Sequence, residues 1–531
     1  MNGRPAAGRI RRGTMPRRAH LLLAALALMA LAGARLLWEP GLLGSHGGEV
    51  YGHAWVLSWH AAALPDWPAG TDLALNTERW PVIDPLPTLL AACLARIFGL
   101  IAGYNTWILA SVGLAFIGGA TLAEREGGDP WVGGLALALA PALAGSLASG
   151  LTEDGAVGLA ALGLAFAGDR APRRAALGGL GLGLLAASGL VLAWTAALAA
   201  TGFALVSIVR DRTNLKAWVL SGSIAILMAI PVALLQGDRL SGVGHHAGRA
   251  PELVEPLWRL NPWRGVDLLS FLAPGPQDPG DALVRMHPGY LGLVALALAA
   301  FAGRSRWWAV LVGAALVAPG LRLSAGGQPL GLSNPFAEAL AALPFGALLN
   351  HHGRVLLLGA VALSALAARG AARLAPRLGR AAPLLPALLA ADLLLCSPLP
   401  LPLPVAEADP PDIASKLGDL SPGPMLVLPV SGPGVHPQRP LLDQRVHHRA
   451  LLLNPNRPGL PDALTRAPAA RWLSSLAFPD PAPAPAALTL PGVAVLLVDA
   501  PQVAAVEAVL GAPDLRGEHA SAWDLERRAA P

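Results

Sequence analysis

The sequence predicts an all-α polytopic membrane protein that ends in a small α/β domain outside the membrane. Of its 531 residues, 54% are apolar and only 14% are charged, and the mean hydropathy is +0.51. Apolar runs alternate with short arginine-rich loops, as in chains that cross a bilayer many times. The final polar part of the chain has short strand-like runs. The first expected partner is therefore the lipid bilayer. The basic composition is explained by membrane topology and is poor evidence for nucleic acid.

Charge distribution sets the predicted topology. Residues 1–18 form a basic tail, which the positive-inside rule places in the cytoplasm. The first apolar run, at about 19–38, is expected to stay uncleaved as span one. Residues 19–398 then form a transmembrane domain of about 11 helices, with the arginine-rich connections inside. The ten further spans are predicted at about 104–123, 131–148, 155–167, 175–188, 191–209, 217–235, 288–302, 307–319, 353–368 and 383–398.

The predicted outer side has four loops before the last domain. They cover residues 39–103, 148–155, 236–287 and 320–352.

Two helices are expected in the first outer loop. Residues 85–101 are apolar, but the run is short and contains Arg96, so we interpret it as a surface or re-entrant helix. Residues 47–64 have an amphipathic period. Glu49, His53 and His60 share one face, and an aromatic stripe occupies the other. This pattern favours a helix at the membrane surface with its titratable face toward an aqueous cavity.

The C-terminal part divides into a linker and a domain. Residues 399–411 are a proline-rich linker, and residues 412–531 are predicted to form the extracytoplasmic α/β domain. Strand-like runs lie at 425–430, 493–498 and 520–525, and a helical pattern lies at 502–510. Upstream, the glycine-rich run 178–183 lies inside a span with no preceding strand. It therefore indicates close helix packing rather than a dinucleotide site.

Three outer acids are candidate catalytic residues. Glu49 follows span one, and Glu153 and Asp154 lie in the tight outer turn between two spans. Carboxylates facing one cavity could act as a general base for an acceptor hydroxyl or hold a divalent ion near a phosphate. The alternative is that they cap helices and face water, with Thr152 or an aspartate as N-cap.

Histidine and arginine side chains supply candidate binding residues. Glu49, His53 and His60 could sterically hold a metal, but no metal-ligand motif supports this, so no metal site is assigned. The sequence identifies no cofactor. A divalent cation would suit the acids, but the absence of any cofactor is the favoured expectation. Arginine can clamp a phosphate, although an interfacial arginine often only snorkels. The candidate substrate-binding or lipid-phosphate-binding residues are His53, His60, His245, His246, Arg249 and Arg354.

The arrangement and several motifs resemble the GT-C superfamily of integral-membrane glycosyltransferases. The nearest likeness is to the bacterial branch of protein mannosyltransferases and aminoarabinose transferases, which carries a C-terminal outer domain. Glu49 falls at the position of that family's first-loop acid, although the family more often has Asp. Pro141 followed by Glu153 and Asp154 resembles its second loop. Further similar segments are 66–70, 85–86, 98–99, 104–105, 288–292, 350–354, 443–445 and 492–499.

The resemblance implies a transferase that uses a polyprenyl-phosphate-linked sugar. The acceptor would be an envelope glycan, lipid or protein at the outer face of the bacterial cytoplasmic membrane. Glu49 would then be the base or acceptor-orienting group, Glu153 or Asp154 would assist, and a loop histidine or arginine would meet the donor phosphate. Whether the sugar is a hexose or a pentose stays open.

Two other functions are compatible with the scaffold. The first is a non-catalytic envelope-assembly or lipid-handling protein, because a shared fold does not carry activity. The second is a transporter, which the nearly uncharged spans disfavour. Asp392 is the main ionisable residue within a predicted span, and it lies toward the outer end.

Overall fold

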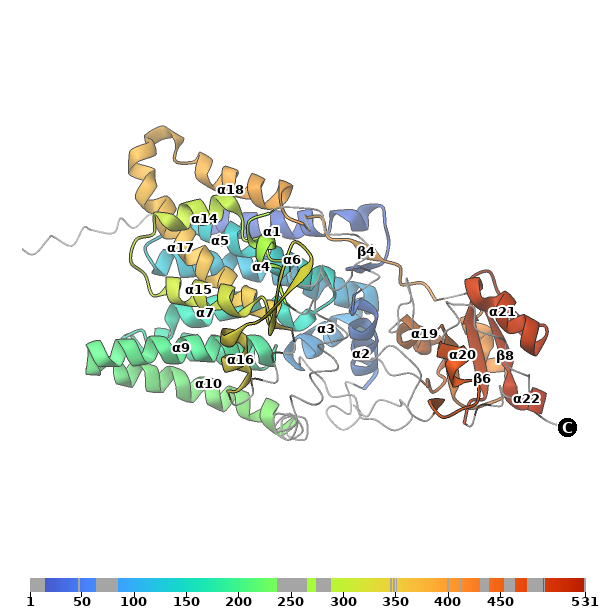
Figure 1. The fold of residues 1–531 in the computed structure, drawn as a ribbon. Helices are drawn as coiled ribbons and strands as arrows, with labels where there is room; N and C mark the ends of the chain where they lie inside the picture. The colour runs from blue at the N-terminus through green and yellow to red at the C-terminus, as the bar shows by residue number, and fades with distance from the viewer. Residues whose placement is uncertain are drawn as a thin grey trace, which may run out of the picture.

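The computed structural model has a large helical domain joined to a small α/β domain (Figure 1). The two domains lie at opposite ends of the picture, with α2 and α19 between them. The structure describes residues 15–45, 48–63, 85–235, 265–273, 288–343, 346, 349, 351–398, 401–410, 412–429, 439–452, 464–474, 490 and 492–529.

The helical domain follows the predicted order of spans. Its helices are α1 (Met15–Ala32), α2 (Val50–Ala63), α3 (Pro85–Phe98), α4 (Leu100–Arg125), α5 (Pro130–Ala138), α6 (Pro141–Ala148), α7 (Val157–Phe166), α8 (Pro172–Ala186), α9 (Leu190–Arg210), α10 (Leu215–Leu235), α14 (Leu293–Ala300), α15 (Trp307–Val317), α16 (Pro335–Ala341), α17 (Val355–Leu378) and α18 (Leu384–Leu395).

Every predicted span coincides with a helix or a helix pair in the described part of the chain. By length and composition, five helical segments there could cross a membrane: Leu100–Arg125, Pro130–Ala148, Leu190–Arg210, Arg212–Leu234 and His352–Ala381. The chain is thus a mostly helical, multi-pass membrane-type protein, and the count of 11 spans stays a prediction.

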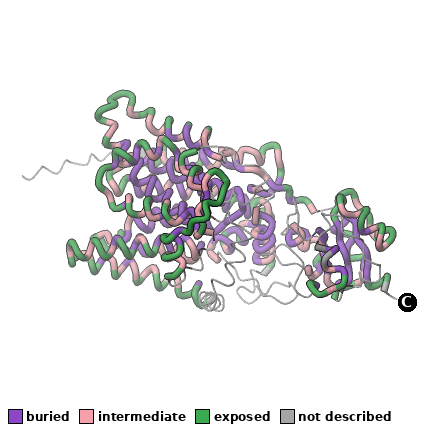
Figure 2. Tube along the Cα trace, in the orientation of Figure 1, coloured by how far each residue is buried: buried purple, intermediate pink, exposed green. Residues whose placement is uncertain are grey.

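Helix α17 forms the centre of the helical domain. It is buried at every position from Val355 to Ala368 and packs against α4, α5, α7, α9, α14 and α15. Figure 2 shows buried residues concentrated in the interior of this domain, whereas α9 and α10 at its edge are largely intermediate or exposed. Because the exposed residues of α9 and α10 are mainly apolar, these two helices have the composition of a lipid-facing wall.

Helix α3 is a short helix that pairs with α4. Gly99 has a φ of 91° and separates the two helices, and α3 packs against both α2 and α4. A side chain at Gly103 would lie only 2.6 Å from the backbone nitrogen of Ala95, so glycine permits the close approach. That this helix lies at the surface or re-enters, rather than crossing the membrane, stays a prediction.

The glycine-rich run packs closely against neighbouring helices, as predicted. A Cβ atom at Gly179 would lie 2.4 Å from the carbonyl oxygen of Ser221 on α10. A Cβ atom at Gly181 would lie 2.9 Å from the Cα atom of Gly163 on α7. Small residues therefore bring the backbones of α7, α8 and α10 together.

The predicted inner connections meet at one end of the bundle. Arg306 and Arg369 both donate to the carboxylate of Glu126, at 2.9 and 3.2 Å. Arg125 and Arg174 pair with Asp169 in the next connection. These contacts join loops far apart in sequence, as expected if the loops share one side of the membrane.

Hydrogen bonds to neighbouring residues give Asp392 a structural role. Its carboxylate accepts hydrogen bonds from the Tyr290 hydroxyl at 2.6 Å and the Val294 amide at 2.8 Å. It therefore holds the start of α14 in place. Among the described residues, this acid joins no ionic pathway through the bundle.

The C-terminal domain has a four-stranded sheet in the order β5-β6-β8-β7. The β5–β6 pair is parallel, and the other two pairs are antiparallel. The region thus contains both helices and a sheet, and its extent as a separate extracytoplasmic domain stays a prediction. Its elements are β5 (Met425–Leu428), α19 (Arg439–His447), α20 (Ala470–Ser474), β6 (Val495–Asp499), α21 (Ala500–Leu510), β7 (Leu515–Arg516), β8 (Ala520–Asp524) and α22 (Leu525–Ala529).

Two small sheets lie outside this domain. In the predicted linker, β4 (Val405–Ala406) pairs antiparallel with β1 (Leu42–Leu43), so this segment is bound to the start of the first outer loop. Asn105 of α4 supports β1 by accepting from the Leu43 amide at 2.8 Å and donating to the Gly41 carbonyl at 2.9 Å. The second sheet is the hairpin β2 (Arg322–Ala325) and β3 (Gln328–Ser333) in the last outer loop.

Candidate active site

Three segments from the predicted outer side converge on one ionic cluster, which consists of Glu49, His53, Glu153, Asp154 and Arg354. The first segment is the start of α2, the second is the 3-10 turn Thr152–Ala156, and the third is the turn His352–Arg354 that precedes α17. The predicted catalytic acids and the predicted arginine therefore lie together.

Backbone contacts hold the first two segments in register. The Glu49 amide donates to the Ser149 carbonyl at 2.6 Å, and the Ser45 amide donates to the Ala148 carbonyl at 2.5 Å. Gly150 has a φ of +80°, and a Cβ atom there would lie 2.5 Å from the Val50 nitrogen. Glycine is thus needed where the loop approaches α2. These contacts place Glu49 beside the second acidic turn.

Arg354 joins the two acids of the turn. Its Nη2 donates to Glu153 Oε1 at 2.8 Å, and its Nε lies 3.6 Å from Asp154 Oδ2. The side chains of Glu153, Asp154 and Arg354 are 6%, 1% and 10% exposed. At such burial, ionic groups are stable only when paired, and here they are.

The histidine of α2 lies between two carboxylates. His53 Nε2 is 3.7 Å from Glu49 Oε2 and 3.8 Å from Glu153 Oε2. Its Nδ1 is 2.8 Å from the Thr152 hydroxyl. The hydroxyl orients the imidazole, so Nε2 can interact with either acid.

Burial and charge act differently on the two acids of the turn. Burial alone would raise the pKa of Glu153, but the charges of Arg354 and His53 outweigh it and hold that pKa below its usual value. Burial raises the pKa of Asp154 to about 6, although Arg354 opposes the shift, and the negative charge of Glu153 adds to it. Ser146 donates to Asp154 Oδ2 at 2.9 Å. The neighbouring acids thus differ in their readiness to bind a proton.

Glu49 is the solvent-accessible carboxylate of the cluster. Its side chain is 37% exposed, whereas the other two acids are almost fully buried. An incoming hydroxyl could therefore reach Glu49 without first breaking the ion pairs of Arg354. The geometry suits Glu49 as a base and the buried residues as its electrostatic support.

Helical capping does not explain the acidic turn. The helix α7 that follows has no side-chain N-cap hydrogen bond, and Glu153 and Asp154 are buried rather than facing water. Thr152, expected as a possible cap, contacts His53 instead. The capping interpretation was wrong because the turn is buried against α4 and α6, and Thr152 contacts His53 of α2; local sequence does not reveal these tertiary contacts.

The other predicted binding residues do not join the cluster. His60 is on α2 but is 1% exposed, and its ring nitrogens have no hydrogen-bond partner among the described residues. Burial lowers its pKa to about 4, so it is a neutral, buried side chain. His245, His246 and Arg249 lie outside the described residues. Within the described ranges, no three His, Cys, Asp or Glu side chains are placed to hold a metal ion.

Thr152, Ser146 and Trp107 were not predicted as site residues. The Trp107 indole donates to the Thr152 carbonyl at 3.1 Å and so supports the acidic turn from α4. Ser146 gave one usable signal in the sequence, since a hydroxyl in an apolar span needs a partner. Its partner could not be identified without the fold.

The aromatic face of α2 packs on the C-terminal domain. The Trp55 indole donates to Gln444 Oε1 on α19 at 2.9 Å, and Trp55 is buried in one cluster with Leu441. The Arg439 guanidinium lies 4.9 Å from the centre of the Tyr51 ring. One helix thus carries His53 toward the acids and its aromatic residues toward α19. The pattern correctly separated Glu49 and His53 from the aromatic residues, but it wrongly placed His60 with them at a cavity, and it could not identify what covers the aromatic face.

Comparisons with known proteins support the fold. No family model and no curated protein matches the sequence. Among solved structures, arabinofuranosyltransferase AftD from Mycobacteria matches with a TM-score of 0.51 and 20% identity. The match covers 91% of this chain and 36% of that protein, so the chain spans about a third of the length of AftD.

Two further structures match with lower scores. ArnT from Cupriavidus metallidurans has a TM-score of 0.42 and 16% identity, covering 97% of this chain and 99% of its own. The Archaeoglobus fulgidus oligosaccharyltransferase has a TM-score of 0.46 and 14% identity, covering 92% and 70%. The match to AftD shows that the chain shares its fold with that protein, in line with the resemblance to the GT-C superfamily that the sequence predicts.

Proposed function

We propose that the protein is a membrane glycosyltransferase that moves a sugar from a polyprenyl-phosphate donor to an acceptor. The reaction would take place at the outer face of a bacterial cytoplasmic membrane. The observation that carries this proposal is the meeting of Glu49, Glu153, Asp154 and Arg354 around His53. Because all five lie at the predicted outer ends of helices, the cluster could receive a lipid-linked donor from the outer leaflet.

Glu49 is the proposed general base. Its carboxylate takes the proton from the acceptor hydroxyl, and the hydroxyl oxygen forms a bond to the anomeric carbon of the sugar. The bond from that carbon to the phosphate oxygen breaks, and polyprenyl phosphate leaves with the electron pair. General-base catalysis of this kind contributes about 10²- to 10⁴-fold to a rate.

His53 and the buried ion pairs have supporting roles in this proposal. The imidazole lies between Glu49 and Glu153, so it can orient the base and limit repulsion between the two carboxylates. Arg354 is paired with Glu153 and lies near Asp154. Its proposed role is therefore to hold these two acids in place rather than to bind the donor phosphate. His245, His246 and Arg249 remain proposed contacts to the donor phosphate.

The acceptor and the sugar define the assay. The solved structure with the highest of the three scores is of an arabinofuranosyltransferase, so a pentosyl donor is the first to try and a hexosyl donor the second. The acceptor would be an envelope glycan, lipid or protein. Running each reaction with and without a chelator would test the need for a divalent cation.

Glu49→Gln tests the proposal most directly. We expect at least about a hundred-fold loss of sugar transfer, because glutamine keeps the shape of the side chain but cannot accept the proton. Transfer would be measured with purified full-length protein, with protein abundance checked in membranes. Glu39→Gln, which removes another acid of the same loop, should retain activity. Full activity of Glu49→Gln would rule out Glu49 as the base.

The pairing within the cluster also favours one alternative. Arg354 lies near two buried carboxylates, and such pairs can serve packing alone in a non-catalytic envelope-assembly or lipid-handling protein. In that case Glu49→Gln alone would leave the envelope of the cell unchanged, and no donor would be consumed by the wild-type protein.

A further inference from the structure

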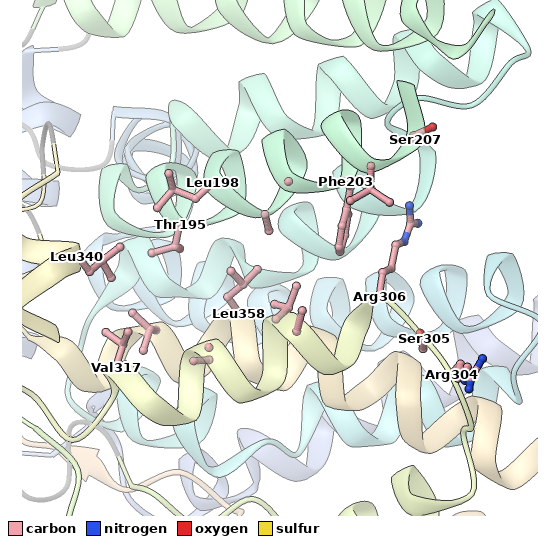
Figure 3. A pocket seen from close by; sticks show the side chains of 18 of the residues that line it. Thr195, Leu198, Phe203, Ser207, Arg304, Ser305, Arg306, Val317, Leu340 and Leu358 are labelled. Atoms are coloured by element: carbon pink, nitrogen blue, oxygen red, sulfur yellow. The ribbon is translucent and has the colours of Figure 1, made fainter. Parts of the chain in front are cut away.

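A mostly apolar groove runs along the bundle from Val355, which directly follows Arg354 of the ionic cluster. It lies between α9 and α15 over the first turns of α17 and has a volume of about 950 Å³. Figure 3 shows apolar side chains along it, including Leu198, Phe203 and Leu358. The groove is large enough for a sizeable ligand, since ligand pockets typically measure about 300–1,000 Å³.

One end of the groove is basic. Arg210, Arg304 and Arg306 line it there, together with the polar side chains of Ser207 and Asn214. Figure 3 shows Arg304 and Arg306 at the end away from Val317 and Leu340. An apolar channel that ends in positive charge matches a molecule with hydrocarbon chains and an anionic head group.

The basic end lies at the membrane face opposite the ionic cluster. Gly189, which precedes α9, packs against Glu153, and Arg210 is the last residue of α9. This helix has 21 residues, so its ends are about 30 Å apart, which is the thickness of the hydrocarbon core. The basic end therefore falls at the predicted cytoplasmic surface, about one membrane thickness from the ionic cluster.

The three arginines differ in their partners. Arg306 pairs with Glu126 at 2.9 Å and lies 4.3 Å from the centre of the Phe203 ring, so it is fixed in position. Arg210 and Arg304 are exposed, and within the described ranges neither has a carboxylate partner. These two side chains are therefore available for a phosphate, to which arginine can donate two hydrogen bonds.

Two glycines open the groove from facing walls. Gly202 on α9 and Gly313 on α15 both line it, and a Cβ atom at either position would meet no atom within 4 Å. Their small size thus leaves free space rather than allowing helices to touch. This space could take an acyl chain.

We propose that the groove binds an anionic phospholipid of the cytoplasmic leaflet, with its acyl chains between α9 and α15 and its phosphate at Arg210 and Arg304. The lipid would fill a gap in the helix packing that the chain itself leaves open. A structural lipid of this kind would stabilise the fold by binding only the native state. The proposal does not depend on glycosyltransferase activity.

Thermal unfolding of the full-length, delipidated protein in detergent tests the proposal. Added phosphatidylglycerol should raise the unfolding temperature more than phosphatidylcholine with the same chains. Arg210→Gln and Arg304→Gln should each weaken phosphatidylglycerol binding about fivefold, as expected for one basic residue near an anionic lipid. Arg173→Gln, at an exposed predicted-inner arginine outside the groove, is the matched control.

Filling the groove gives a second, independent readout. Gly202→Phe and Gly313→Phe should abolish stabilisation by the lipid without lowering the melting temperature of the lipid-free protein. Gly222→Phe, on α10 and outside the groove, has equal free space and should bind lipid normally. Equal stabilisation by both lipids would overturn the proposal. The proposal would also fail if the glycine variants abolished stabilisation while the arginine variants did not, because the groove would then hold acyl chains without recognising a head group.

Discussion

At the scale of single residues, the ionic cluster holds three carboxylates around one guanidinium. His53 adds positive charge only when it is protonated. The buried members Glu153 and Arg354 stabilise each other, since each would be costly to bury alone. Glu49 can remain accessible because it does not take part in that pair. This division between a buried scaffold and an open acid is what favours catalysis by Glu49.

Glu153→Gln should destabilise the protein strongly. It removes the charge that faces Arg354 and leaves a poorly paired buried cation, at a cost of about 3–5 kcal/mol in the free energy of unfolding. Thermal unfolding in detergent would measure the change, with Glu338→Gln on the exposed surface of α16 as control. The double variant Glu153→Gln/Arg354→Met should be less destabilised than the sum of the single variants. A strictly additive result would contradict the ion pair.

His60 should make the protein sensitive to acid. Its pKa is about 4 in the fold and about 6.5 in an unfolded chain, so the unfolded state binds more protons between these values. Stability is therefore fully present above about pH 6.5 and falls as the pH drops toward 4, by up to about 3 kcal/mol.

The variant His60→Leu isolates this effect. Asp154 acts in the opposite direction, because its raised pKa of about 6 makes the folded state bind the extra proton, and stability rises as the pH falls below that value. The difference between wild type and His60→Leu removes the contribution of Asp154. From pH 7 to pH 4 the melting temperature of wild type should fall relative to that of His60→Leu, because only wild type has the buried imidazole. Parallel curves would contradict a buried neutral His60.

At the scale of elements, close packing of α8 against α10 depends on glycine. Gly179→Ala would place its Cβ atom 2.4 Å from the Ser221 carbonyl oxygen and 2.9 Å from Ile224. Backbone must move to relieve this contact, which should cost about 1–3 kcal/mol. Gly222→Ala on α10 meets no atom within 4 Å and should be neutral or slightly stabilising in a helix. Thermal unfolding compares the two; equal effects would mean that α8 and α10 are not in close contact.

Helix α2 links the two domains at the same scale. Its start supplies Glu49 and His53 to the cluster, and its aromatic face is anchored by Arg439 and Gln444 of α19. The C-terminal domain therefore contributes to holding the helix that carries the proposed base. This packing on α2 gives a structural reason why the C-terminal domain is attached to the membrane domain.

At the scale of the whole molecule, the charge distribution predicts opposite locations for two sets of loops. The connections that meet around Glu126 would be cytoplasmic, and the ionic cluster and C-terminal domain would be outside. Helix lengths near the membrane thickness separate the two ends.

Cysteine labelling tests this topology. Cys93 and Cys396 would be replaced by alanine, and single cysteines introduced as Glu518→Cys in the C-terminal domain and Arg173→Cys in the first turn of α8. In sealed right-side-out vesicles, a membrane-impermeant maleimide should label the first variant and not the second. Detergent should expose both. Labelling of Arg173→Cys in intact vesicles would invert the predicted orientation.

The sequence by itself determined the class of fold, the order of the helices and the residues that carry the proposed chemistry. Hydrophobic runs and arginine-rich loops act locally, so they could be identified without coordinates. The acidic turn and Glu49 were found the same way, because charge is rare in this chain. Tertiary structure alone decided that Glu49, Glu153, Asp154 and Arg354 meet, that His60 lies apart, and that α19 covers α2. Those contacts join residues separated by long stretches of chain, and no local periodicity reports which buried surfaces will face one another.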